Sequence, residues 1–335
     1  MKTNFWIALG CFILLSTSDC FGQMGSFLSS SNQFGLEKIR TMKSMQEHIQ
    51  WVSLENESEV VRQLQANGFT MLSNGVISAA GITNERLRCY VAKKDNAVVI
   101  VFRGTKAVGN PGQTFINTVV SDANIKQVVP SFINSNSVAP SSSYRNSKVH
   151  QGFNNAYMRV RQSILAALQN QPNTVNVFVF HSLGGALGTL CALDLAVNQN
   201  RRYASITHIV SGSPRVGDAT FRAYFERAVK NNLRIVVNSD PIPSVPNFYG
   251  LRAANKYHHA GNLLVLGKQD ANIALATIDV HPNIRHFPNH ANELYLQVVS
   301  SFLSKSIQNP SIYARGNKII EEIADKEREL ANKRF

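Results

Sequence analysis

The sequence is poor in cysteine, the residue that cross-links a chain and that binds zinc in most structural zinc sites. Only four of its 335 residues are cysteines, and two of these, Cys11 and Cys20, lie close to the N-terminus. The other two, Cys89 and Cys191, are about a hundred residues apart. Two cysteines cannot form a disulfide framework, and this spacing matches no zinc motif. We expect Cys191 to pack inside a helix, with a Cys89–Cys191 disulfide as the alternative.

Long apolar runs and internal repeats are also missing. Beyond the N-terminus, no apolar run approaches the ~20 residues that span a bilayer. Hydrophobic residues make up 44% of the chain, which argues against a collagen-like, disordered or coiled-coil protein. A chain of this length can bury one large core or two smaller ones. We therefore expect a globular protein without a transmembrane segment.

The first residues have the order of a secretory signal. Lys2 is followed by the apolar run from Phe5 to Leu15, then by a polar stretch and the small residue Gly22. The apolar run has 11 residues, too few to cross a bilayer. We expect residues 1–22 to be a signal peptide and the protein to be secreted.

The formal net charge is +13, but the lysines and arginines are scattered along the chain. No aromatic-rich pattern of the kind that binds RNA or DNA accompanies them. Charge alone therefore gives only weak support to a polyanion binder, and we expect no nucleic-acid partner. An anionic lipid or a cell surface is a more natural partner for a secreted basic protein.

Strand-like and helix-like segments alternate between residues 86 and 238, after a helical region at 36–66. Strands are predicted at 86–92, 97–102, 175–180, 206–211 and 233–238, and helices at 153–169 and 184–197. This alternation predicts a mostly parallel sheet with helices on both faces. Residues 106–147 look irregular, and residues 309–335 form a highly charged helical tail. We expect one domain over residues 23–308.

The segment VNVFVFHSLGGALGTL indicates a serine nucleophile. A buried strand ends at Phe180, a tight turn carries Ser182, and Gly184 and Gly185 open a helix. Such a strand–turn–helix exposes the serine hydroxyl, and glycine two residues later lets the helix pass close to the strand. The helix N-terminus also favours the negative charge that develops during acyl transfer. Ser182 is therefore the candidate nucleophile of an α/β-hydrolase.

Four blocks, in this order, resemble those of the class 3 (fungal-type) lipases, a family of α/β-hydrolases. The blocks are IVFRGT at 100–105, VHQGF at 149–153, HSLGGAL at 181–187 and GSPRVGD at 212–218. The resemblance covers roughly residues 85–300. It implies hydrolysis of ester bonds in lipids, without a cofactor or a required metal. One position departs from the pattern, because Phe180 stands where the first glycine of G-x-S-x-G is usual.

A serine nucleophile needs a base and an acid, which follow it in that fold in the order acid, then histidine. Asp240 comes just after a predicted strand and therefore at the same sheet edge as Ser182. It also precedes Pro241, so a simple turn-forming role is the alternative. The resemblance implies His290 as the base, with His286 as the second choice. It also implies a structural role for the pair His258 and His259.

The resemblance implies an oxyanion hole formed by Thr105 and the backbone N–H of Leu183, with Asp122 as a support for Thr105. It also places a lid at residues 106–121, which contain Gly109 and Gly112 beside a small apolar face. Arg103 is interpreted as a structural ion-pair former.

Together these features predict a secreted serine carboxylester hydrolase that acts on lipid esters at a lipid–water interface. Two alternatives stay open. One is a catalytically weak lipid-binding relative, motivated by Phe180. The other is a serine peptidase on the same fold.

Overall fold

The computed structural model describes residues 36–81, 86–104, 126–139, 142–171, 176–180, 182–198, 203, 205–237, 240–246, 257–267, 288 and 290–309. The helices in this part of the chain are α3 (Leu36–Val52), α4 (Glu57–Ala66), α6 (Gln151–Leu168), α7 (Ser182–Asn198), α8 (Ala219–Ala228) and α9 (Asn292–Gln308), with the 3-10 turns η1 (Ser142–Asn146) and η2 (Ile242–Ser244). The strands are β1 (Thr70–Met71), β2 (Ile77–Ala80), β3 (Arg86–Lys94), β4 (Ala97–Phe102), β5 (Gln127–Val128), β6 (Val149–His150), β7 (Asn176–Phe180), β8 (Ser205–Ser211), β9 (Asn231–Val237) and β10 (Leu263–Leu266).

Eight of these strands form a mixed sheet whose longer part is parallel, while β5 and β6 form a separate two-stranded sheet. In the described residues the order is β1-β3-β4-β7-β8-β9-β10, and β2 also pairs with β3. Strands β4, β7, β8, β9 and β10 run parallel to one another, whereas β1, β2 and β4 are antiparallel to β3. The carboxyl ends of β4, β7, β8 and β9 therefore meet at one sheet edge, where crossover connections leave room for a site.

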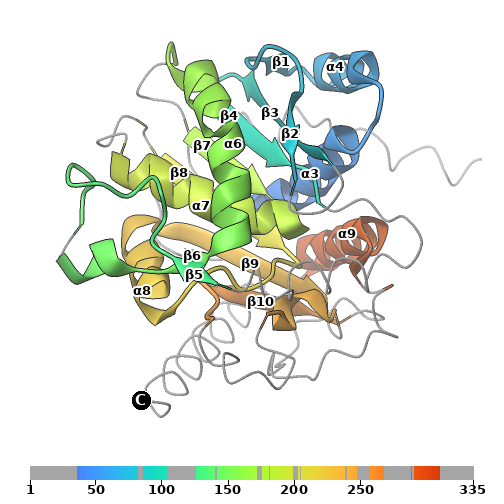
Figure 1. The fold of residues 1–335 in the computed structure, drawn as a ribbon. Coiled ribbons are helices and arrows are strands. Elements are labelled where there is room, and N and C mark those ends of the chain that lie inside the picture. The colour runs from blue at the N-terminus through green and yellow to red at the C-terminus, as the bar shows by residue number, and fades with distance from the viewer. Residues whose placement is uncertain are drawn as a thin grey trace, which may run out of the picture.

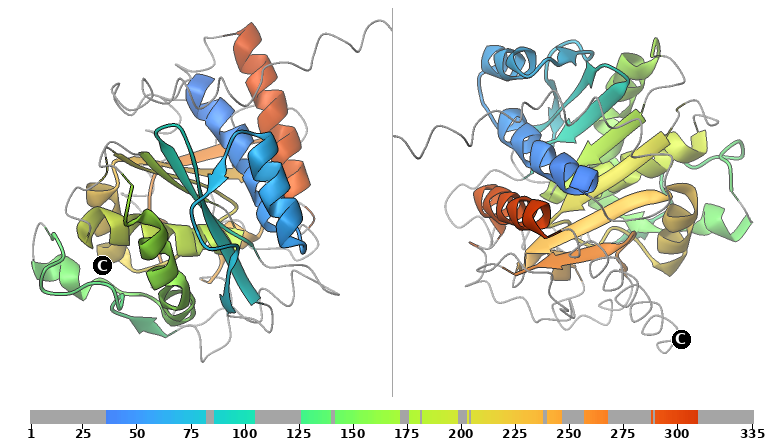
Figure 2. Two further views of the ribbon diagram at one scale, coloured as in Figure 1. Left: turned by 90° about the horizontal axis from the view of Figure 1, so that it is seen from above. Right: turned by 180° about the vertical axis from the view of Figure 1, so that it is seen from behind.

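Two apolar cores lie on the two faces of the sheet, as the alternation along β3 and β4 requires. Cys89 and Val91 pack into one core with α6, α7 and α8, while Tyr90 and Ala92 pack into the other with α3 and α9. The helices thus cover both faces, and α3 and α9 lie side by side on one of them (Figures 1 and 2). Both faces of β4 are buried, which explains why its AVVIVF run is apolar without alternation.

Most predicted elements agree with the structure to within one or two residues, but the helical region at 36–66 is two helices. The break falls at residues 53–56, where the side chain of Asn56 accepts a hydrogen bond from Ser58 N and caps α4. This side chain competes with a continuous helix for a backbone donor. The apolar periodicity on both sides of the break concealed it.

Both core cysteines are buried with free thiols, so the packed interpretation of Cys191 is confirmed and the disulfide alternative is wrong. Burial raises the pKa of both thiols. Each therefore stays protonated and acts as a small apolar side chain.

Several predictions concern residues outside the described part of the chain. They are the signal peptide at 1–22, the lid at 106–121 and the tail, of which only residue 309 is described. Among the described helices, none has the length and apolar character needed to cross a membrane.

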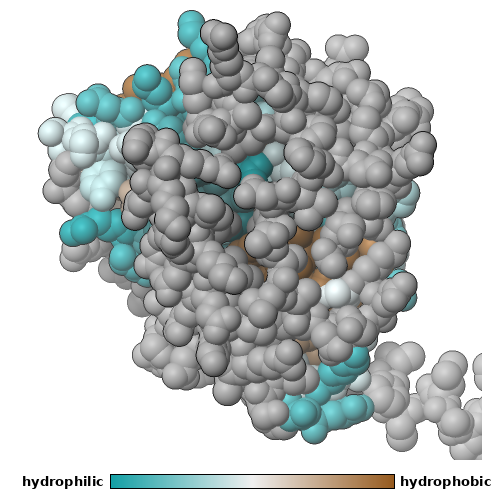
Figure 3. Space-filling model, turned by 90° about the horizontal axis from the view of Figure 1, so that it is seen from below, coloured by the Kyte–Doolittle hydropathy of each residue, from teal (hydrophilic) through white to brown (hydrophobic). Residues whose placement is uncertain are grey.

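The surface of the described residues carries few large apolar side chains. Only Val129, Val138 and Ile307 are strongly exposed within this part of the chain. In the view from below, apolar side chains of the described residues show to the right of the centre and at the upper left, and hydrophilic ones show near the centre, at the upper left and at the lower right (Figure 3).

Candidate active site

Ser182 occupies a strained turn between β7 and α7. Strand β7 ends at Phe180, and Ser182 is the first residue of the helix. Its φ angle is +54°, a left-handed conformation that a residue with a Cβ rarely adopts. Strain of this kind persists only where the surroundings enforce it, and it is a feature of nucleophile elbows. The side chain is otherwise well enclosed, because the residue is 4% exposed.

The glycine two residues after Ser182 has the role that the motif predicts. A Cβ on Gly184 would collide with the backbone carbonyl of Phe102 at the end of β4. Only glycine lets the first turn of α7 pass so close to the neighbouring strand. The interpretation of Gly184 as the close-approach residue is therefore confirmed.

The structure brings Ser182, His290 and Asp240 together in one hydrogen-bonded chain. Ser182 Oγ lies 2.8 Å from His290 Nε2, and His290 Nδ1 lies 2.8 Å from Asp240 Oδ2. Because the carboxylate accepts a hydrogen bond from Nδ1–H, Nε2 of the neutral ring carries the lone pair that can accept the hydrogen bond of the serine hydroxyl. This is the arrangement in which a histidine acts as the base of a serine nucleophile.

The carboxylate of Asp240 is held on both oxygens. Oδ1 accepts a hydrogen bond of 2.9 Å from Ile242 N, and Oδ2 accepts one of 2.6 Å from the hydroxyl of Tyr295 as well as the one from His290. The side chain has no exposed surface. Asp240 thus forms its own turn and orients the histidine, so the two interpretations of its role are compatible.

Tyr295 is a site residue that the sequence did not single out. It lies in α9, is fully buried, and accepts a hydrogen bond of 3.1 Å from Val237 N while donating to Asp240. Burial, and then the nearby Asp240 carboxylate, raise the pKa of Tyr295 well above its usual value. The hydroxyl therefore remains a neutral donor. Its place in the first turn of the helix that follows the candidate histidine was the available signal.

Gly212 gives the His290–Asp240 pair its space. Its φ is +56°, and a Cβ there would lie 2.8 Å from His290 Cε1 and 2.9 Å from Asp240 Oδ2. The GSPRVGD block thus begins directly against the pair, at the end of β8. A side chain at this position would displace the ring or the carboxylate.

The neighbouring histidines His258 and His259 lie apart from the hydrogen-bonded chain of Ser182, His290 and Asp240. His259 is buried and its Nε2 donates to the carbonyl of Pro243 at 2.8 Å, while His258 N donates to Gly217 O. Burial, followed by the charges of nearby arginines, lowers the pKa of His259 well below its usual value. The structural interpretation of this pair fits these contacts.

The remaining candidates divide into those the structure describes and those outside its described part. Leu183 follows Ser182 in the first turn of α7, where backbone N–H groups have no partner within the helix. Thr105, Asp122 and His286 fall outside the described residues.

Arg103 pairs with Glu55, Nη1 to Oε1 at 3.6 Å, and its Nη2 donates to the carbonyl of Arg86. The ion-pairing interpretation of Arg103 is thus confirmed.

Within the described residues, no cluster of three or more His, Cys, Asp or Glu side chains could hold a metal ion.

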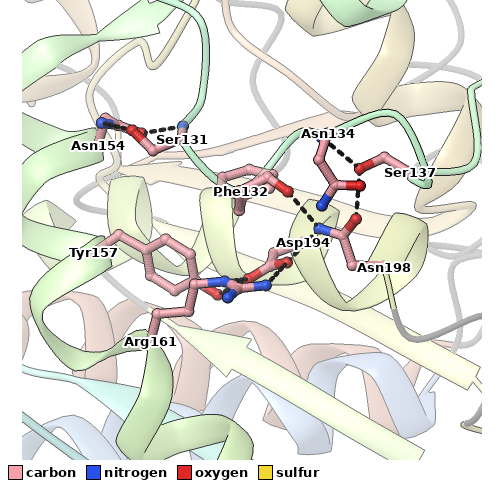
Figure 4. Close-up of polar contacts among 9 residues, drawn as sticks. All are labelled: Ser131, Phe132, Asn134, Ser137, Asn154, Tyr157, Arg161, Asp194 and Asn198. Atoms are coloured by element: carbon pink, nitrogen blue, oxygen red, sulfur yellow. Dashed lines mark hydrogen bonds and ion pairs between the residues drawn. The ribbon is translucent and has the colours of Figure 1, made fainter.

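The far half of α7 is fixed by a buried carboxylate. Asp194 accepts hydrogen bonds from Tyr157 Oη and Arg161 Nε, both at 2.6 Å, and from Asn198 Nδ2 at 2.6 Å (Figure 4). Asn198 Nδ2 also donates to the carbonyl of Phe132. These contacts tie the helix that carries Ser182 to α6 and to the segment around Phe132.

The central part of the chain matches a known protein family. Residues 99–250 match the family model described as Lipase (class 3). The matched segment runs from β4 past Asp240 and includes Ser182, whereas His290 follows it. Over this segment, which is less than half of the chain, the sequence is similar to the class 3 lipases.

Individual relatives point the same way. The chain is 30% identical, over 188 residues, to the secreted mono- and diacylglycerol lipase A of Penicillium cyclopium, a match that covers 55% of this chain and 53% of that lipase. The chain thus spans about half the length of the curated relative it matches.

Solved structures share the fold over a longer stretch. Lipase II from Rhizopus niveus aligns with a TM-score of 0.55 at 20% identity, covering 79% of this chain and 98% of that one. A triacylglycerol lipase whose catalytic centre is a serine protease triad aligns with a TM-score of 0.50 at 20% identity, covering 78% of this chain and 95% of that one.

Proposed function

We propose that this protein is a secreted serine carboxylester hydrolase of the α/β-hydrolase fold that acts on lipid esters, with Ser182, His290 and Asp240 as its catalytic triad. The observation that carries the proposal is the chain of two 2.8 Å contacts from Ser182 Oγ through His290 to Asp240. It begins on a left-handed serine at a helix N-terminus. A serine hydroxyl is a weak nucleophile unless such a base is in contact with it.

In the first half of the reaction, Ser182 Oγ attacks the ester carbonyl carbon while His290 Nε2 takes the hydroxyl proton. The imidazolium that forms is stabilised by the Asp240 carboxylate. The tetrahedral intermediate then collapses, the bond to the alcohol oxygen breaks, and His290 returns the proton to the leaving alcohol. The acyl group is left on Ser182.

In the second half, water replaces the alcohol. His290 removes a proton from the water, which attacks the acyl-enzyme, and the proton returns to Ser182 Oγ as the fatty acid leaves. The negative oxygen formed in each half requires donors already in place. The backbone N–H of Leu183 is one proposed donor, and Thr105, outside the described residues, is the other. No step requires a metal or a cofactor.

Lipid as the substrate class, and secretion, rest on the comparisons. The Penicillium cyclopium relative is a secreted mono- and diacylglycerol lipase, and one structural neighbour is a triacylglycerol lipase. We propose a lipid ester, met at a lipid–water interface, as the substrate. The expected signal at residues 1–22 is consistent with export.

Labelling with a fluorophosphonate probe, together with hydrolysis assays on emulsified mono- and triacylglycerols, tests the proposal. Ser182→Ala should abolish labelling and reduce hydrolysis on the order of 10⁶-fold, because the nucleophile is lost. His290→Ala should reduce hydrolysis by a similar factor, and the double variant should be hardly worse than either single variant, because triad residues act as a unit.

Ser73→Ala is the control for loss of a buried serine. Among the described residues, the Ser73 hydroxyl forms hydrogen bonds only with the backbone of Gly75 and Val91, so this variant should keep its activity. Three outcomes would contradict the proposal. They are substantial turnover by Ser182→Ala, cleavage of peptides without cleavage of esters, and binding to lipid vesicles by a wild-type protein that does not react with the probe.

A further inference from the structure

One residue of α3, Gln46, contacts both segments that carry the His290–Asp240 pair. Gln46 is 2% exposed, and its Nε2 donates a hydrogen bond of 2.9 Å to Ser211 Oγ at the end of β8. Its backbone carbonyl accepts a hydrogen bond of 3.3 Å from Nδ2 of Asn292, the first residue of α9. Helices α3 and α9 run side by side, so these contacts join neighbouring elements (Figures 1 and 2).

The contact with Ser211 reaches the pair through Gly212. Ser211 immediately precedes Gly212, whose N–H is held by the carbonyl of Ile235 at 2.9 Å. A single added methyl group on Gly212 would touch both His290 and Asp240, at 2.8 and 2.9 Å. The turn at Ser211 and Gly212 therefore lies directly against His290 and Asp240. A displacement of Ser211 would move the imidazole ring and the carboxylate.

The contact with Asn292 secures the other side. His290 lies two residues before α9, and the residue at the N-cap of that helix, Ala291, provides no side-chain hydrogen bond. The N-terminus of α9 thus lacks the usual side-chain cap that would fix the entering chain. The link from Asn292 to Gln46 supplies a tie between this end of α9 and a neighbouring helix.

Stability alone does not explain a glutamine at this position. Met42, Met45 and Ile49, beside Gln46 or one turn from it, are buried and apolar, although α3 also buries the polar residues Thr41, Ser44 and His48. Gln46 Oε1 is itself buried, and no donor in the described part of the chain reaches it. An unsatisfied buried amide oxygen lowers the stability of the fold, and a methionine of similar length would not have this defect.

We propose that Gln46 is a positioning residue for ester hydrolysis, holding the His290–Asp240 pair in line with Ser182 through Ser211 and Asn292. The inference rests on the proposed function. It gives α3, which precedes the segment matched to the lipase family, a part in arranging the site.

Gln46→Met tests the inference, since it keeps the length of the side chain and removes the hydrogen bond to Ser211. We expect kcat to fall about tenfold with KM within about twofold, because misplacement of a reacting group by about 1 Å can reduce the rate by up to 10²-fold. The denaturant midpoint should stay unchanged or rise. A merely structural residue would lower that midpoint and leave kcat alone.

Gln50→Met is the matched control. Gln50 lies one turn further along α3 and is partly buried, and its side chain makes no hydrogen bond among the described residues. The same substitution there should change neither kcat nor the midpoint. Ser211→Ala removes the same hydrogen bond from the other side, so it should lower kcat as Gln46→Met does, and the double variant should be no worse than the singles.

The His290 Nδ1–H proton, bound to Asp240, provides a readout that needs no substrate. Its low-field NMR resonance should shift or broaden in Gln46→Met and Ser211→Ala and remain in place in Gln50→Met. A wild-type protein without esterase activity would refute the proposed function while this resonance still tests Gln46. Equal kcat and an unchanged resonance in Gln46→Met, or in Ser211→Ala should Gln46→Met not fold, would overturn the inference.

Discussion

At the scale of single residues, the orientation of the proposed base depends on how its carboxylate partner is held. Asp240 Oδ2 accepts from both His290 Nδ1 and the Tyr295 hydroxyl, and Oδ1 is engaged by Ile242 N. A carboxylate with its lone pairs used in this way has one preferred orientation. Tyr295 contacts no reacting atom, so its contribution is to hold Asp240.

Tyr295→Phe should lower kcat about tenfold or more and leave KM nearly unchanged. Hydrogen bonds to charged groups are worth about 1.5–3 kcal/mol, and each ~1.4 kcal/mol corresponds to a tenfold change in rate. KM should hold because Tyr295 is buried behind Asp240. Steady-state kinetics on a soluble short-chain ester give both constants.

Tyr224→Phe is the control for this substitution, because the Tyr224 hydroxyl donates to the carbonyl of Val138, away from the three site residues. It should reduce stability slightly and preserve kcat. If both variants lost kcat equally, or if Tyr295→Phe kept full activity, the role of Tyr295 would be packing alone.

At the scale of elements, α7 joins a functional N-terminus to a structural C-terminal half. Its first turn carries Ser182 with positive φ, and its later turns carry Asp194, which α6 holds through Tyr157 and Arg161. The anchor lets the strained turn persist, because α7 cannot shift to relax it.

Asp194→Ala should destabilise the protein by about 3–5 kcal/mol, because it leaves the Arg161 charge and the Tyr157 hydroxyl without their buried partner. Tyr157→Phe, which removes one hydrogen bond, should cost about 1 kcal/mol. Urea unfolding of each variant measures both values. The exposed pair Arg62 and Glu59 is the comparison, and Glu59→Ala should have a much smaller effect. An Asp194→Ala variant as stable as Glu59→Ala would contradict the anchoring role.

At the scale of the whole molecule, three buried histidines make stability depend on pH. Burial, aided by the charges of Lys94 and Arg234 respectively, lowers the pKa of His48 and of His208 to about 3, and burial also depresses that of His259. His208 Nε2 donates to the hydroxyl of Thr189, which itself donates to a backbone carbonyl. With its pKa lowered to about 3 by burial, the ring is neutral in the folded protein near pH 7.

Stability should therefore fall as the pH drops below about 6.5. Histidines of the unfolded chain bind protons near pH 6.5, whereas these three stay neutral in the fold until much lower pH, so the unfolded state binds more protons in between. Each contributes up to about 1.4 kcal/mol per pH unit over this window. Above pH 7 these groups should have no effect.

His208→Gln keeps a donor for Thr189 and removes the titrating group. Free energies of unfolding measured by urea between pH 7 and pH 4 should decline less steeply in this variant than in the wild-type protein. Equal slopes for the two proteins would show that His208 does not contribute to the loss of stability in acid.

Features that depend on local patterning could be predicted from the amino-acid sequence. The apolar run of β4, the alternation of strands and helices, and the strand–turn–helix around Ser182 are encoded within short windows, where backbone sterics and burial act on neighbouring residues. Asp240 was also accessible, because carboxyl ends of parallel strands gather at one edge.

The contacts between distant segments became visible only in the folded chain. His290 lies 108 residues from Ser182 and 50 from Asp240, and Tyr295 and Gln46 reach the same place from α9 and α3. No local pattern records such contacts, because they arise when two helices pack on one face of the sheet and bring buried polar groups within hydrogen-bonding distance. The break between α3 and α4 is by contrast local, since the Asn56 side chain caps α4 through Ser58 N, two residues further on, and outweighed a periodicity that continued through the break.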